Sequence, residues 1–431
     1  MQRHPIPSKP HVRAIVRESA HRGRHVPGSV NVNLDQDPAL DAFRGEVAAF
    51  LDSAPTDAIR EAGRKTTSVF APFEQVMAWH RILAKKGWAA PSWPVEYGGT
   101  GWSVEQRYVY AEEYWKRDLP PLLPNGLQMV GPLLMHLGSE EQKQRYLPGI
   151  LAGEDYWTQG YSEPGAGSDL AALSCSALAD GDDYVINGSK IWTTYAHHAN
   201  RMFMLVRTST EGKKQAGITF LLLDRVDLPG IEIRPIIGLD GVPEQCEVFF
   251  RDVRVPQSGR VGAENDGWSV AKQLLVHERG GAVASPALRR RVQAIREAAS
   301  HTRTPFGGTL ADDPVFQRDL GLLEAEIGSI EHVEKLAMSG HSIAQDFAFP
   351  SMAKVMNTEI TQTLSVLMAR VAGLNSLALQ TEALEVGSST PQLDDDFSLV
   401  AMPYYLNSRA TTIYAGTNEI QRDLIARSIA R

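Results

Sequence analysis

The sequence predicts an α+β protein: an N-terminal helical domain, a central antiparallel β-barrel or sandwich, and a C-terminal four-helix-bundle domain. Three observations carry this prediction. The hydrophobic period is helical up to about residue 155, changes to two up to about residue 262, and is helical again to the end. The predicted units are an extension at 1–34, a helical domain at 35–155, a β domain at 156–262 and a helical bundle at 263–431.

Caps and glycines locate the elements of the helical domain. The predicted starts and stops are Asp37 with Pro38, a helix over 73–86 ended by Gly87, and capping boxes of Ser103 with Gln106 and Ser139 with Gln142.

Short period-two runs locate the β domain, and long periodic runs locate the bundle. Turns are predicted at 181–182 and 187–188. A long helix is predicted over 358–384, with only Gly373 as a weak break. The predicted strands are 184–186, 202–206, 218–223 and 248–250.

The first 34 residues form a basic, proline-rich extension. They hold six Lys and Arg residues and four prolines against one acid, Glu18. A transit peptide is also Arg-rich and acid-poor, but it forms an amphipathic helix, which these prolines oppose. The sequence therefore predicts a disordered extension.

Composition excludes several classes of function. The chain has 431 residues, of which 43% are hydrophobic and 22% charged, as in globular proteins. Its formal net charge is −8, whereas a general nucleic-acid binder needs a basic face. The apolar run 218–223 is too short to span a bilayer. Only Cys175 and Cys246 occur, so no disulfide framework is expected, and a reducing, cytoplasmic compartment is predicted.

Three short motifs look functional but lack the context that their chemistry needs. The stretch 165–170 begins like a dinucleotide-binding fingerprint, but Leu170 stands in place of its last glycine. Residues 340–344 are a near match to a nucleophile elbow without a flanking strand. The histidines at 197–198 are adjacent and share no face of a strand or helix, so no metal site is expected.

Two segments carry the strongest functional signal. Residues 159–169 (QGYSEPGAGSD) are rich in small residues, so main-chain N–H groups there can approach a ring or a phosphate closely. In 188–194 (GSKIWTT), Trp192 stands beside hydroxyl residues and is suited to lie on a flat aromatic cofactor. Taken singly, the first segment also fits a plain turn, and Trp192 also fits a core residue.

With two further motifs, these segments resemble the acyl-CoA dehydrogenase family of flavoproteins over most of residues 35–431. The stretches 163–169 and 190–194 match the two family signatures, 414–421 (YAGTNEIQ) matches the C-terminal one, and 303–307 fits an R-x-x-F-G element. The family order of helical, β and helical domains matches the division above. The chain looks most similar to the large subunit of pimeloyl-CoA dehydrogenase and related bacterial enzymes.

The resemblance implies that the chain binds FAD. Tyr161 and Ser162 would meet the pyrimidine side of the flavin, Trp192 would pack on its ring, and Thr194 would bond near its reactive nitrogen. The family's glycine-rich stretch across the dimer is reduced here to residues 372–374. The other implied cofactor contacts are Gln159, Ser168 (also near the CoA arm), Arg303 and Phe306 on the FAD of a neighbouring subunit, Thr417 and Glu419.

The family reaction removes a proton from Cα of an acyl-CoA while Cβ delivers a hydride to the flavin, so a base must face the flavin across the thioester. The position that often carries this base is Ala415 here, which keeps only its N–H for the thioester oxygen. Glu278 is the candidate, because on a helix it shares a face with Ala271 and Leu274, where desolvation raises a carboxyl pKa. Isovaleryl-CoA dehydrogenase and many bacterial relatives place their base at the matching Glu-Arg pair. The alternative is that Glu278 only pairs with a cation such as Arg279, which is itself expected at CoA or as a helix cap.

The small residues at 280–282 leave room for a bulky, branched or long acyl chain, and the alternative is that the paired glycines only weaken the helix. The resemblance implies electron-transferring flavoprotein as electron acceptor and a homodimer, homotetramer or heterotetramer as the assembly. No nucleic-acid partner, membrane insertion or metal is expected. Two alternatives stay open: a flavin oxidase or monooxygenase of the same fold, and a subunit of a hetero-oligomeric dehydrogenase.

Overall fold

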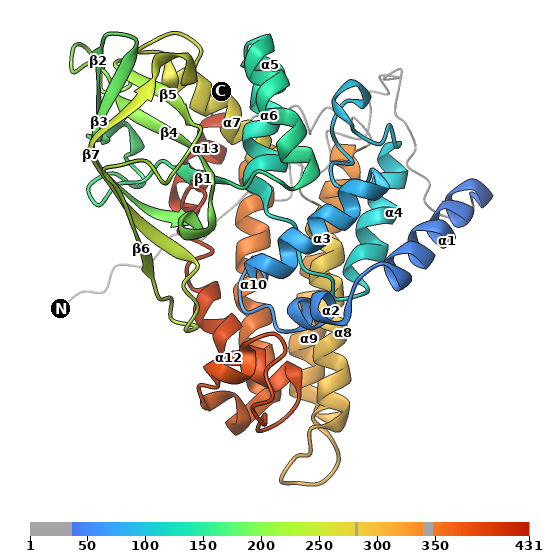
Figure 1. Cartoon of the computed structure of the whole chain (residues 1–431). Coiled ribbons are helices and arrows are strands. Elements are labelled where there is room, and N and C mark those ends of the chain that lie inside the picture. The colour runs from blue at the N-terminus through green and yellow to red at the C-terminus, as the bar shows by residue number, and fades with distance from the viewer. Residues whose placement is uncertain (1–36, 281–282, 339–347, 431) are drawn as a thin grey trace, which may run out of the picture.

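The protein is described here by a computed structural model, which covers residues 37–280, 283–338 and 348–430, with the side chains of 276–280 outside the described set. The predicted order of helical, β and helical parts is confirmed (Figure 1). The extension at 1–34 and the elbow-like stretch 340–344 lie outside the described residues. Within the described residues, no helix is both long enough and apolar enough to cross a membrane.

The predicted caps of the N-terminal helices are confirmed. Both capping boxes, at Ser103 and Ser139, have their reciprocal hydrogen bonds, and Gly87 ends its helix in the left-handed conformation. The helices here are α1 (Pro38–Ser53), α2 (Asp57–Arg64), α3 (Phe73–Lys86), η1 (Val95–Tyr97), α4 (Val104–Trp115), the π-helix η2 (Asn125–Val130), α5 (Gly131–Leu137) and α6 (Glu140–Ala152).

The β domain is one mixed sheet, with strand order β6-β7-β3-β2-β4-β5-β8 and β1 beside β4. Most neighbours are antiparallel as predicted, but β1 and β2 both run parallel to β4. The strands are β1 (Trp157–Gly160), β2 (Ser176–Asp180), β3 (Asp183–Thr194), β4 (Arg201–Arg207), β5 (Ile218–Leu223), β6 (Ile231–Ile236), β7 (Gln245–Pro256) and β8 (Arg260–Val261), with short helical turns η3 (Leu170–Ala172), η4 (Ala196–His198) and η5 (Gln257–Gly259).

The turn predicted at 187–188 is wrong, because both residues lie inside β3. The register between β3 and β7 shifts there, and the extra residue stands on β7. The Asn187 side chain accepts from the Asp252 N–H at 2.9 Å and donates to its carboxylate at 3.0 Å. A bulge and a turn both favour Asn-Gly, so the dipeptide alone did not separate them.

The C-terminal helices pack side by side as a bundle (Figure 1). The helix predicted over 358–384 is wrong at both ends, because α10 begins already at Phe349 and stops at Ala372, where Gly373 takes a positive φ of 58°. The helices are α7 (Gly267–Gly280), α8 (Ser285–His301), η6 (Leu310–Asp312), α9 (Pro314–Met338), α10 (Phe349–Ala372), η8 (Gly373–Leu377), α11 (Thr381–Leu384), α12 (Asp396–Ser408) and α13 (Asn418–Ile429).

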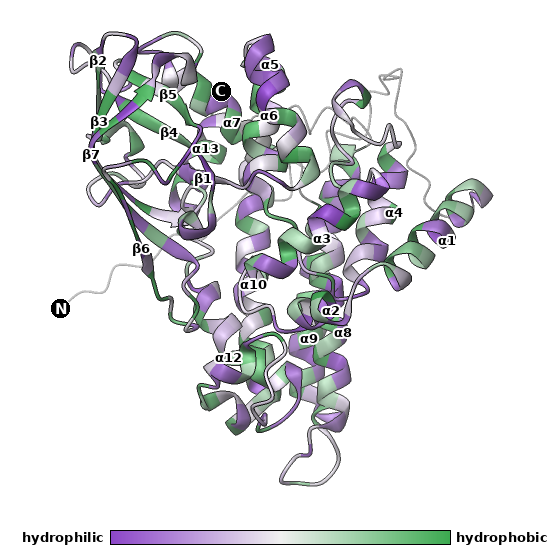
Figure 2. Ribbon diagram, viewed as in Figure 1, coloured by the Kyte–Doolittle hydropathy of each residue, from purple (hydrophilic) through white to green (hydrophobic). Residues whose placement is uncertain are grey.

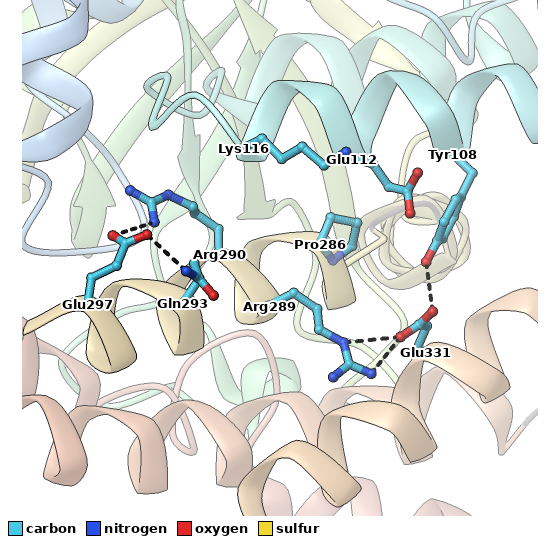
Figure 3. Close-up of a pocket in the computed structure, with 9 residues that line it drawn as sticks. All are labelled: Tyr108, Glu112, Lys116, Pro286, Arg289, Arg290, Gln293, Glu297 and Glu331. Carbon is cyan, nitrogen blue, oxygen red and sulfur yellow. Dashed lines mark hydrogen bonds and ion pairs between the residues drawn. The ribbon is translucent and has the colours of Figure 1, made fainter. Parts of the chain in front are cut away.

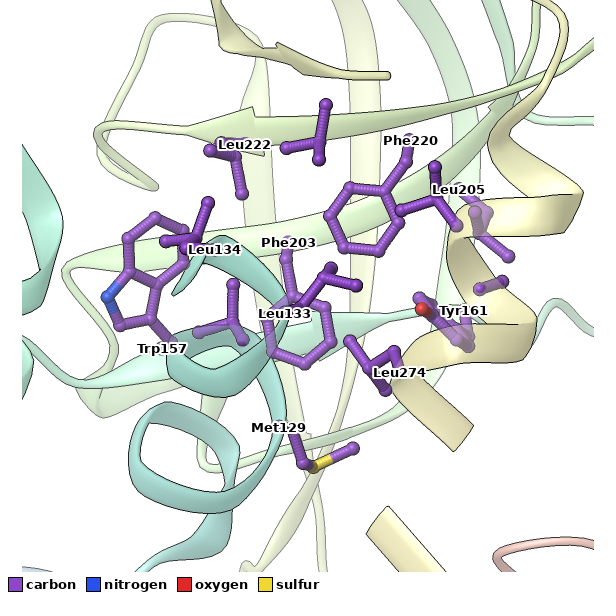
Figure 4. Packing of buried hydrophobic residues seen from close by; sticks show 14 of the residues in the cluster. Met129, Leu133, Leu134, Trp157, Tyr161, Phe203, Leu205, Phe220, Leu222 and Leu274 are labelled. Atoms are coloured by element: carbon purple, nitrogen blue, oxygen red, sulfur yellow. The ribbon is translucent and has the colours of Figure 1, made fainter. Parts of the chain in front are cut away.

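The largest core cluster joins the N-terminal helices, the sheet and the first helix of the C-terminal part, α7. Leu133 of α5, Phe203 of β4, Phe220 of β5 and Leu274 of α7 are buried together (Figure 4). Strands β4 and β5 are hydrophobic along most of their length (Figure 2), which fits strands covered on both faces. The N-terminal helices and α7 are thereby fixed against the sheet that carries the signature loops.

Candidate functional site

The loop after β1 is an open, small-residue turn. Glu163 and Ala166 close it with two main-chain hydrogen bonds, of 2.9 and 3.0 Å. A Cβ built on Gly165 or Gly167 would meet no atom within 4 Å, so this side of the loop faces open space. Ser168 is exposed on the same loop. The arrangement leaves main-chain groups and a hydroxyl free to meet a ligand.

A buried ion pair joins this loop to the second signature segment. Lys190 is 0% exposed, and its ammonium donates to Glu163 Oε1 at 2.8 Å and to the Tyr161 carbonyl at 3.2 Å. The Ile191 N–H also donates to the Ser162 carbonyl at 2.9 Å. These bonds hold the two signature segments in one fixed relation.

Both carboxylate oxygens of this ion pair accept hydrogen bonds. Glu163 accepts from the N–H and the hydroxyl of Ser174, at 2.7 and 2.9 Å, and from the Cys175 N–H at 2.9 Å. Burial raises the pKa of the Glu163 carboxyl, but the charge and hydrogen bond of Lys190 and these N–H donors outweigh it, so the pKa lies below the usual value. Glu163 is therefore a structural anion rather than an acid-base group.

Trp192 is the most unusual side chain in the described part of this site. It is 59% exposed, although tryptophan is rarely left in water, and it has a positive φ of 62°. Between Lys190 and Thr193 the register with β7 shifts by one residue, which places this bulge at the indole. The fold therefore holds a large aromatic face outward beside the open loop.

Tyr161 does not present its ring to this surface. The ring is buried among apolar residues and lies edge-on to Phe203 and Phe220, with centroids 6.0 and 6.3 Å away (Figure 4). The expected contact with a flavin is thereby restricted to the main chain of Tyr161. Ser162 and Gln159 beside it are partly exposed.

Thr194 is tied to residues that the sequence did not point to. Its hydroxyl donates to Gln245 Oε1 at 3.3 Å, and Gln245 Nε2 donates to Glu244 Oε1 at 2.8 Å. Glu244 also accepts from the Ser68 hydroxyl of the N-terminal domain. No local motif marks these residues, because their meeting depends on the cross-strand register of β3 and β7.

The C-terminal motif provides a second unusual backbone. Ala415 has a positive φ of 53°, a conformation that costs a non-glycine residue free energy. Thr417 caps α13 by accepting from the Ile420 N–H at 3.3 Å, and Glu419 is exposed in the first turn. Strain next to an exposed helix start is typical of functional segments.

The segment with Arg303 and Phe306 is not brought to the signature loops. It lies between α8 and α9, at the end of the bundle away from the β domain (Figure 1). Phe306 is 99% exposed. The position fits the expectation that these residues reach a neighbouring subunit.

The candidate base lies on α7, whose Ala271 and Leu274 are buried in the core shared with the sheet. The side chains of Glu278 and Arg279 lie outside the described residues. The role of Glu278 therefore stays a prediction.

Two other clusters of polar residues do not form part of this site. A cavity of about 480 Å³ between α4 and α8 is lined by ionic groups that already have partners, such as Arg289 with Glu331 at 2.9 Å (Figure 3). His197 Nδ1 lies 3.1 Å from Cys246 Sγ, and His198 stacks on Phe73. In the described part of the chain, no group of His, Cys, Asp and Glu residues could hold a metal ion.

Comparison with known proteins shows the family to which the chain belongs. Three domain profiles match in order: acyl-CoA dehydrogenase N-terminal domain at 37–154, middle domain at 158–253 and C-terminal domain at 265–430. Acyl-CoA dehydrogenase IpdE1 of Mycobacterium tuberculosis is 36% identical over 358 residues, covering 83% of this chain and 88% of that protein. Acyl-CoA dehydrogenase FadE26 of the same organism is 31% identical, covering 91% and 97%.

Solved structures of similar fold indicate the same family. The ChsE4-ChsE5 complex from Mycobacterium tuberculosis has a chain with 30% identity and a TM-score of 0.75, covering 92% of this chain and 98% of that one. The Tcur3481-Tcur3483 steroid ACAD has a chain with 28% identity and a TM-score of 0.76, covering 93% and 99%. The chain thus belongs to the acyl-CoA dehydrogenase family, whose members are oxidoreductases.

Proposed function

We propose that this chain is an FAD-dependent dehydrogenase that desaturates an acyl-CoA thioester between Cα and Cβ. The observation that carries the proposal is the outward-facing indole of Trp192, held on a bulge beside an open small-residue loop. An exposed aromatic face next to free main-chain groups fits a flat, polar-edged cofactor such as the isoalloxazine of FAD. FAD supplies the hydride acceptor.

The residues of this chain hold that cofactor in three places. Trp192 packs on the ring, and Thr194 meets the edge that carries the reactive nitrogen. Ser168 and the N–H groups of the open loop meet the pyrophosphate and the CoA arm, and Gln159 and Ser162 stand beside them. Thr417 and Glu419, at the start of α13, meet the cofactor from the C-terminal side.

The proton chemistry belongs to α7. Glu278 removes the α-proton, because a carboxylate among the small and apolar neighbours of that helix face is desolvated and becomes a stronger base. The Ala415 N–H donates to the thioester oxygen and stabilises the developing enolate. The side chain of Ala415 takes no part, so replacing a glutamate at that position does not remove the donor. Arg279 meets the phosphate or pantetheine of CoA.

The substrate we propose is a CoA thioester with a bulky acyl group, in which steroid-derived chains are the leading class. Two observations support this: small residues follow the base at 280–282, and a structurally similar protein is described as a steroid ACAD. Cyclohexane-1-carbonyl-CoA dehydrogenase of Geobacter metallireducens, 28% identical, is a relative named for an alicyclic acyl group.

We also propose an assembly of at least two subunits, with electron-transferring flavoprotein as the acceptor. Phe306 is fully exposed at the tip of its loop. Exposed apolar side chains also occur on two segments, at Ile237 and Leu239 and at Leu374, Leu377 and Leu379. The segments approach each other near Gly241, where a Cβ built on the glycine would lie 3.9 Å from Leu379 Cδ1. Exposed apolar surface of this kind marks interaction sites. The ChsE4-ChsE5 relative is a complex of two different chains, which makes a heteromeric partner the alternative to a second copy.

The experiment is an anaerobic titration of the purified protein with a panel of acyl-CoAs, in which bleaching of the flavin absorbance is followed. We expect bleaching by bulky acyl-CoAs. The Glu278→Gln variant should keep FAD and lose bleaching, whereas Glu326→Gln, an exposed glutamate on α9, should behave as the wild type. Undiminished turnover in Glu278→Gln rules out the proposed base. Turnover that needs oxygen instead of a flavoprotein acceptor identifies the alternative, an oxidase or monooxygenase.

A further inference from the structure

In the chain of hydrogen bonds from Ser68 to Thr194, the carboxylate of Glu244 determines which group donates and which accepts at each step. Glu244 lies at one end, buried, and accepts from Ser68 and from Gln245 Nε2. A carboxylate only accepts, so the NH₂ end of the Gln245 amide must face it. Amide orientation is usually ambiguous, but here the acid settles it.

The orientation of the Gln245 amide in turn determines the role of the Thr194 hydroxyl. With its NH₂ end on Glu244, the amide of Gln245 turns Oε1 toward Thr194, and this oxygen accepts the hydroxyl hydrogen at 3.3 Å. The hydroxyl has only one hydrogen. Thr194 therefore has no hydrogen left to donate elsewhere, but it keeps lone pairs that can accept.

Other contacts keep Thr194 in this place. Its carbonyl accepts from the Tyr156 hydroxyl at 2.9 Å and from the Thr158 hydroxyl at 2.8 Å, and it pairs with Gln245 across β3 and β7. The residue thus cannot shift easily, and only rotation of its hydroxyl would change the direction of the chain.

We propose that Glu244 and Gln245 are positioning residues that make Thr194 a hydrogen-bond acceptor toward the flavin. This rests on the proposed function, in which Thr194 meets the reactive ring nitrogen. That nitrogen carries a hydrogen only in the reduced flavin, whereas in the oxidised flavin it is an acceptor. An acceptor hydroxyl therefore stabilises the reduced cofactor and leaves the oxidised one without a partner.

Loss of the Gln245 amide should change the midpoint potential of the flavin in one direction. Gln245→Leu frees the Thr194 hydroxyl to rotate and to donate to the oxidised flavin. The ratio of affinities for reduced over oxidised FAD should fall several-fold, and each tenfold fall lowers the two-electron midpoint potential by about 30 mV. Glu244→Gln, a near-isosteric change, should move the potential in the same direction, because a second amide no longer fixes the orientation of Gln245.

The test is a reductive titration against a reference dye at mildly alkaline pH. An alkaline pH is needed to keep Glu244 ionised, because burial raises the pKa of its carboxyl, although the hydrogen bonds from Ser68 and Gln245 oppose this shift. The Gln245→Leu substitution is measured in the wild type and in a Thr194→Val background, where its effect on the potential should vanish. Glu247→Gln, on the same strand and outside the chain of bonds, is the control and should leave the potential unchanged.

Each outcome has one meaning. A lowered potential that depends on Thr194 supports the inference. An unchanged or raised potential in Gln245→Leu overturns it, and so does an equal shift without the threonine hydroxyl, which would indicate a general structural effect. A purified protein without flavin absorbance overturns the proposed function itself and is detected before any titration.

Discussion

The buried pair of Lys190 and Glu163 allows a sharp prediction on stability, because its two ends are supported unequally. If Lys190 is changed to Met, Glu163 keeps three donors from Ser174 and Cys175. If Glu163 is changed to Gln, Lys190 keeps the Tyr161 carbonyl, and the new amide nitrogen has to face donors such as the Ser174 N–H.

Removing one partner of a buried pair costs about 3–5 kcal/mol, since the other charge stays buried. On this scale we expect Lys190→Met to lower the free energy of unfolding by about 3 kcal/mol and Glu163→Gln to lower it by about 5 kcal/mol. The double variant should lose less than the sum of the two, because neither charge is then left alone. Both single variants should also release FAD at a lower urea concentration than the wild type.

The assay is urea unfolding followed by fluorescence and by flavin release. The order of the two single variants is the critical result. If Lys190→Met is as stable as the wild type, or is the more damaged of the two, the account of unequal support is wrong. Arg225→Met, which removes an exposed pair with Asp227, is the control and should change stability little.

Three further predictions concern other buried groups. Burial lowers the pKa of His80 from 6.5 to about 4, although its hydrogen bond to the Leu151 carbonyl opposes the shift. Because the imidazole of the unfolded chain binds a proton at a higher pH, the free energy of unfolding should fall by about 3 kcal/mol as pH drops from 6.5 to 4. His80→Gln should remove this pH dependence, as measured by urea titrations at several pH values. Gly188→Ala should destabilise the fold by about 2 kcal/mol or more, because φ is 140° and the new Cβ would lie 2.7 Å from Cys175 Cα. Gly45→Ala in α1 is the control, since its Cβ would meet no atom within 4 Å and alanine favours a helix, so this variant should be stabilised. Equal thermal midpoints of the two variants would refute this prediction. Glu334→Ala should cost about 2 kcal/mol, because the Ala284 and Ser285 N–H groups at the start of α8 lose their acceptor; an unchanged urea midpoint would show that water replaces it.

The parts of the fold that sequence predicted are those fixed within one turn or one element. Capping boxes at Ser103 and Ser139 act over three residues, and Gly87 ends its helix through its own φ. Gly373 shows the limit of this approach: helical period continues past it, but its backbone turns. The signature segments were found as motifs, and the residues that support them were not. Lys190 in a strand looks like a surface residue until its partner Glu163 is placed across the loop.

The bulge in β3 explains why one strand can serve both the core and the site. In a regular strand Lys190 and Trp192 would point to the same face, because side chains alternate with a period of two. The extra residue between Lys190 and Thr193 breaks this alternation, so that Lys190 and Thr193 are buried while Trp192 between them faces out. The ammonium that fixes the open loop and the indole that faces its ligand thus depend on a single irregularity. Deleting Ile191 would leave Lys190 and Thr193 on the same buried face of a regular strand, with Trp192 between them still facing out. Such a variant should keep its sheet and the outward indole, and it would lose only the bulge and the positive φ at Trp192.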